Sequence, residues 1–100
     1  MIDLQDLEFI EGETTCTTEQ YYLAIQRAIN GGGWALQGSY GRAMMDAING
    51  GYCLLGEKDA RDYWGNHIPS RHQVKEGTKG SFEYVIEHQG QDWANSMVRA

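Results

Sequence analysis

The chain has 100 residues, of which 41% are hydrophobic, and a formal net charge of −6 at pH 7. This length and composition suit one folded domain that spans residues 1–100. They exclude a membrane-spanning helix, since no apolar run reaches ~18 residues. A pI near 4.8 argues against direct nucleic-acid binding, and the acidic N-terminus is unlike a signal peptide, so export is not expected.

The negative charge is concentrated at the N-terminus. Residues 1–26 hold six acids and no Lys or Arg, whereas residues 27–100 hold eight acids and eight bases. A solvated face and a contact with a basic partner both explain such a segment, and the second would accelerate encounter by electrostatic steering. The candidate partner-binding residues are therefore Asp3, Asp6, Glu8, Glu11, Glu13 and Glu19.

Residues 1–16 form an acidic N-terminal segment whose local structure the sequence leaves open. Ile2 and Leu4 alternate with polar residues, which suits a short strand or extended segment. Leu4, Leu7 and Ile10 recur at a spacing of three, which suits a short helix. The polar stretch 12–17 predicts a loop.

The helical body, residues 17–100, begins with a clear helix start. Thr17 and Gln20 have the spacing of a capping box, in which each satisfies a backbone amide near the other. An apolar stripe at helical spacing follows: Tyr21, Ala24, Ile25, Ala28 and Ile29. Asn30 and the next glycine predict its end.

A second helix is predicted from about Tyr40 to Asn49, with Ser39 as its cap. Its expected inner face is Ala43, Met44, Ala47 and Ile48. Both helices contain Ala-x-x-x-Ala-Ile-Asn-Gly-Gly, at an offset of 19 residues. Such small residues allow close approach, so Ala28 and Ala47 are predicted to lie at a helix crossing, unless the echo is coincidence.

The rest of the chain predicts shorter elements. Residues 52–55 suit either a strand or core packing, and 57–65 suit a turn. Ser70 and Gln73 form a second possible capping box that opens one or two turns to Lys75. Ser81 is predicted to cap a helix to about His88, and residues 91–99 to form a last one. The expected fold is all-α or mainly α: a compact single-domain bundle of about four to five short helices, with a short N-terminal strand or extended segment as an option.

No pattern in the chain predicts catalysis, a metal site or a cofactor. The possible soft metal ligands are irregularly spaced: Cys16, Cys53, His67, His72 and His88. The two cysteines are expected to be free thiols, and Cys53 lies in an apolar run where a thiol is unreactive. The triple glycine at 31–33 follows a helix and lacks the lysine of a phosphate-binding loop. The sequence therefore favours a binding protein over an enzyme, although a small hydrolase with an unrecognised site is a weaker alternative.

Several strings together resemble a known family. They are Gly41-Arg-Ala-Met-Met-Asp-Ala-Ile48, Cys53-Leu-Leu55, Arg61-Asp-Tyr-Trp-Gly-Asn66, Ile68-Pro-Ser-Arg71 and Gly77-Thr-Lys-Gly-Ser81. The chain resembles, over about residues 18–98, a family of small phage and mobile-element proteins that includes a type I-F anti-CRISPR protein of Pseudomonas phages. It departs from the pattern at Glu76, where proline is common.

The resemblance implies a non-enzymatic inhibitor in the host bacterial cytoplasm. Such a protein binds the crRNA-guided surveillance complex, a Csy or Cascade assembly, near its Cas8-type subunit and blocks target DNA. It would act as a monomer in that complex, with no membrane and no direct nucleic-acid contact. Arg42, Asp62, Trp64 and Asn66 match the family pattern, but a carboxylate pair for Arg42 and core packing for Trp64 would explain them equally. The alternative is a phage host-takeover or structural protein with no CRISPR target.

Overall fold

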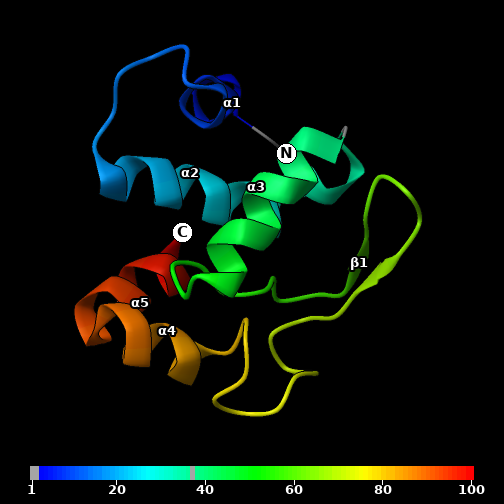
Figure 1. Cartoon of the computed structure of the whole chain (residues 1–100), viewed down its shortest axis with the longest axis vertical. Helices are drawn as coiled ribbons and strands as arrows, with labels where there is room; N and C mark the ends of the chain where they lie inside the picture. The colour runs from blue at the N-terminus through cyan, green and yellow to red at the C-terminus, as the bar shows by residue number, and fades with distance from the viewer. Residues whose placement is uncertain (1–2, 37) are drawn as a thin grey trace.

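The computed structural model describes residues 3–36 and 38–100 and is mainly α-helical (Figure 1). Within those residues the helices are α1 (Leu4–Glu11), α2 (Thr18–Asn30), α3 (Gly38–Asn49), α4 (Phe82–Gln89) and α5 (Gln91–Arg99). A 3₁₀ turn, η1 (Gly33–Ala35), joins α2 to α3. Two short strands, β1 (Ala60–Arg61) and β2 (His67–Ile68), pair antiparallel with Ala60 opposite Ile68. This confirms the mainly α class.

Within its described residues, the N-terminal segment contains a helix, Leu4–Glu11, and no strand. Asp3 caps α1, because its carboxylate accepts a hydrogen bond from the Gln5 amide at 3.2 Å. Gly12 ends α1 with a φ of 77°, in the left-handed region that glycine tolerates. Phe9 is buried, and α1 packs on α2 near one end of the molecule's long axis (Figure 1). The acidic segment is therefore docked on the body. Ile2 lies outside the described residues.

Helix α2 begins and ends where its sequence signals predict. The Gln20 amide donates to Thr17 Oγ1 at 3.0 Å, and the Thr17 amide donates to Gln20 Oε1 at 2.8 Å, so the capping box is complete. The predicted cap of the next helix is wrong. Helix α3 already begins at Gly38, so Ser39 lies inside its first turn.

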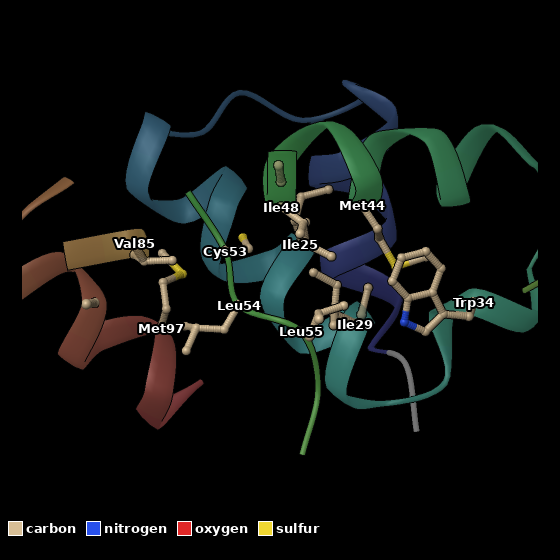
Figure 2. Close-up of a cluster of buried hydrophobic side chains, with 13 residues drawn as sticks. Ile25, Ile29, Trp34, Met44, Ile48, Cys53, Leu54, Leu55, Val85 and Met97 are labelled. Atoms are coloured by element: carbon tan, nitrogen blue, oxygen red, sulfur yellow. The ribbon is translucent and has the colours of Figure 1, made fainter. Parts of the chain in front are cut away.

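One hydrophobic cluster joins helices α2 and α3 to helices α4 and α5 (Figure 2). The extended segment that carries Cys53, Leu54 and Leu55 runs through it, with Val85 and Met97 on one side and the α2 and α3 side chains on the other. Its other buried members are Ile25, Ala28, Ile29, Trp34, Met44, Ala47, Ile48 and Ala94. Residues 52–55 are thus core packing and not a strand.

A buried glutamine supports this extended segment. The Leu54 amide donates to Gln26 Oε1 at 2.7 Å, and Gln26 Nε2 donates back to the Leu54 carbonyl at 3.0 Å. Gln26 lies on α2 and is fully buried, so its amide satisfies backbone groups that would otherwise be buried without partners. This is how a segment outside regular secondary structure can cross the core.

The predicted helix after Ser70 does not form. The Ser70 amide does donate to Gln73 Oε1 at 2.8 Å, but residues 71–73 only make a turn. Arg71 provides the reason: its amide donates to the Gly56 carbonyl at 2.9 Å and its Nε to the Leu55 carbonyl at 2.8 Å. These tertiary contacts hold the turn against the core segment.

Within the described residues, no helix is both long and apolar enough to span a membrane.

Candidate functional site

Asp6 is the one predicted partner-binding acid that the structure buries. Its side chain is 5% exposed and forms a bidentate ion pair with Arg27 on α2. Arg27 Nη2 donates to Asp6 Oδ1 at 2.7 Å, and Nε donates to Oδ2 at 2.8 Å. The hydrogen bonds from Arg27 to Asp6 raise the pKa of the guanidinium, although burial partly opposes this. Asp6 therefore fastens α1 to α2, and its carboxylate is not free for a partner.

Two other acids of the set also help to place α1. Asp3 is its N-cap, as described above. Glu11, at the opposite end of the helix, accepts a hydrogen bond from the Tyr40 hydroxyl on α3. That hydrogen bond raises the pKa of Tyr40 to about 12. Both carboxylates remain exposed, so these contacts orient them without removing them from the surface.

The remaining acids are Glu8 on α1, Glu13 in the α1–α2 connection and Glu19 in the first turn of α2. Glu13 and Glu19 are exposed, and Glu8 is half-buried. Within residues 3–36 and 38–100, none of the three forms an ion pair. The acidic surface is defined here as Asp3, Glu8, Glu11, Glu13 and Glu19. It can attract a basic surface, which is the chemistry that the sequence predicted, although whether a partner binds there stays a prediction.

A second exposed feature, the aromatic turn (residues 62–66), joins β1 to β2. Asp62 organises it: Oδ1 accepts from the Trp64 amide at 3.0 Å and from the Asn66 amide at 2.8 Å. The Arg61 guanidinium donates to the Gly65 carbonyl at 3.0 Å, and Gly65 has a φ of 85°. Burial works against the charge of Asp62, but the hydrogen bonds from Asn66, Trp64 and Gly65 outweigh it and lower its pKa. The predicted turn, residues 57–65, is confirmed only in part, because residues 60–61 form strand β1.

The two aromatic residues of this turn point to solvent. Tyr63 is 58% exposed and Trp64 is 60% exposed, with their rings edge-to-face at 5.5 Å. Core packing was a sequence-level explanation for Trp64, and the structure contradicts it. The sequence could have indicated this exposure, because Asp and Gly at this spacing are typical of a tight turn, and turns usually lie at the surface. Arg42 has no ion pair within the described residues.

The other reactive side chains have structural or surface roles. Cys16 and Cys53 are free thiols, as predicted, and burial raises the pKa of Cys53. His72 and Arg71 both pair with Glu57, at 2.7 Å and 3.0 Å. Across residues 3–36 and 38–100, no group of three or more His, Cys, Asp or Glu side chains is arranged to hold a metal ion.

Comparison of the chain with protein-family models, with curated proteins and with solved structures finds no match. The candidate sites are therefore the acidic surface and the aromatic turn, and each is defined by the geometry of this chain.

Proposed function

We propose that this protein is a phage-encoded anti-CRISPR inhibitor that binds a type I surveillance complex of the Csy or Cascade type. The observation that carries the proposal is the acidic surface. Four of its five exposed or half-buried carboxylates lie on the docked helix α1, at its N-cap or in its connection to α2, and Glu19 lies in the first turn of α2, all in a stretch with no base before Arg27. A surface that grips DNA phosphates is positively charged, so these carboxylates complement it. The sequence resemblance supports the choice of this target.

Inhibition in this proposal is steric and electrostatic. The inhibitor docks near the Cas8-type subunit, occupies the surface that recruits target DNA, and repels the DNA backbone. It acts in the host bacterial cytoplasm, as a monomer, without catalysis, a cofactor or direct DNA binding. Because α1 is braced by the Asp6–Arg27 pair and by Tyr40, little ordering is needed at association, which favours affinity.

A charge-matched pair of variants tests the role of the acidic surface. The first variant replaces Glu8, Glu13 and Glu19 with Gln. The control replaces Glu76, Glu83 and Glu87, which are exposed and include α4 residues at the opposite end of the molecule (Figure 1). Each set removes three negative charges and changes the net charge from −6 to −3.

We expect the first variant to associate more slowly with a purified surveillance complex, and its association rate to depend less on salt. The control should keep most of the wild-type association rate and salt dependence. If both variants associate equally slowly, the effect depends on net charge alone and not on the position of the acidic surface. Inhibition should saturate at a fixed ratio of inhibitor to complex. Time-dependent inactivation at substoichiometric amounts would contradict the binding mechanism, and absence of binding would favour a phage protein with another partner.

A further inference from the structure

A hollow of about 150 Å³ lies beside the aromatic turn. Its lining is mostly apolar and includes Trp34, Trp64 and Met45, together with three charged residues, Arg42, Asp46 and Asp62. Small-molecule sites usually enclose ~300–1,000 Å³. This hollow is therefore sized for one side chain of a partner and not for a cofactor.

Two contacts hold Trp64 in place beside the hollow, one to its backbone and one to its ring. Asp62 fixes its backbone through the hydrogen bonds described above. Its ring packs against the start of α3, where a Cβ built on Gly38 would lie 2.2 Å from Trp64 Cη2. Glycine at this position therefore lets the indole pack close to the helix while 60% of the residue stays exposed. A placed, exposed aromatic ring is a common anchor of protein interfaces.

The charges of the hollow favour a cation. Asp46 is exposed, and within residues 3–36 and 38–100 its carboxylate has no ion pair. Asp62 adds a second carboxylate, whose hydrogen bonds lower its pKa and keep it charged. The one base, Arg42, leaves a net negative lining. An indole face attracts guanidinium groups in particular, through both cation–π contact and stacking.

We propose that this hollow binds an arginine side chain from a basic segment of a protein partner. The indole of Trp64 stacks on the guanidinium plane, and the Asp46 carboxylate accepts hydrogen bonds from its N–H groups. A nucleobase could also stack on Trp64, but its phosphates would face two carboxylates on a chain of net charge −6. This site is separate from the acidic surface and does not depend on which partner that surface binds.

Binding can be measured on the full chain with defined peptides. The probes are a Gly-Arg repeat peptide, the same peptide with citrulline in place of arginine, and single-stranded oligothymidine. Citrulline keeps the shape of arginine and removes its charge. We expect the arginine peptide alone to shift the indole N–H signal of Trp64 in the NMR spectrum. Trp93, whose indole N–H donates to the Tyr52 carbonyl at 2.8 Å, serves as an internal reference that should not shift.

The variants separate this site from general charge attraction. Trp64→Ala should weaken binding of the arginine peptide about 2- to 30-fold, from the usual strength of a cation–π contact. Asp46→Asn should also weaken it, whereas Asp92→Asn, which removes an exposed carboxylate of α5, should not. Amide spectra establish that each variant is folded. Equal binding of the citrulline peptide, equal effects of Asp46→Asn and Asp92→Asn, or a response to oligothymidine alone would overturn the proposal.

Discussion

The buried ion pair between Asp6 and Arg27 predicts how firmly α1 is attached to the body. Arg27→Gln removes two charge-assisted hydrogen bonds, of 2.7 and 2.8 Å, and leaves a carboxylate that is 5% exposed without its cation. Breaking a fully buried pair costs about 3–5 kcal/mol, and an exposed pair about 0–1 kcal/mol. Arg27 is 44% exposed, so the pair lies between these limits and we expect a loss of about 2–3 kcal/mol.

For a domain of about 100 residues, this loss lowers the melting temperature by about 10–15 °C. Thermal unfolding followed by circular dichroism measures it, with Arg99→Gln as the control, because Arg99 is exposed and has no ion pair within the described residues. Hydrogen exchange of the α1 amides should also accelerate in Arg27→Gln. If both variants melt together and α1 exchange is unchanged, the apolar contacts of Phe9 hold the helix and the ion pair contributes nothing measurable.

Two further predictions concern the packing of the core and the loss of stability at acidic pH. Ala28 is buried and contacts Gly33, so the larger side chain of Ala28→Leu should overpack the core and destabilise the fold by about 1–3 kcal/mol. Chemical denaturation measures this loss. Unchanged denaturation midpoints in both Ala28→Leu and Ala47→Leu would refute a tight α2–α3 contact. The hydrogen bond from His72 lowers the pKa of Glu57 below its ordinary 4.5, so its stabilising contribution is present above that pH and disappears as the pH falls through the lowered value. Melting curves of Glu57→Gln should therefore approach wild type only at acidic pH, and a pH-independent difference would contradict this origin.

Local sequence signals predicted most of the helices, because the interactions that begin and end a helix join residues close together in the sequence. The capping box at Thr17, the Asn-Gly ends of α2 and α3, and the cap at Ser81 each depend on residues a few positions apart. The same logic failed at Ser70, because the competing contacts of Arg71 come from the segment 55–56, distant in sequence.

The candidate sites were predicted less well, because a charge pattern does not say which charges pair. Six acids at the N-terminus look alike in sequence, yet Asp6 is bound by Arg27 across 21 residues and Glu11 by Tyr40 across 29. The pairing follows from how α1 packs on α2 and reaches Tyr40 on α3, which the periodicity of the sequence does not determine. The position of the Trp64 ring has a similar origin, since it packs against Gly38 from a distant part of the sequence.

The first turn of α3 contacts both candidate sites, and two substitutions can separate them. Tyr40→Phe removes the hydroxyl that donates to Glu11, so α1 amides should exchange faster while the Trp64 indole signal stays in place. Gly38→Ala adds a Cβ that displaces the far edge of the Trp64 ring, so that signal should shift and the arginine peptide should bind more weakly. Little stability should be lost in Gly38→Ala, because the displaced atoms belong to an exposed side chain and alanine favours a helix by up to ~1 kcal/mol over glycine. If either variant produces both effects, the first turn of α3 couples the acidic surface to the aromatic turn, and the two sites do not act independently.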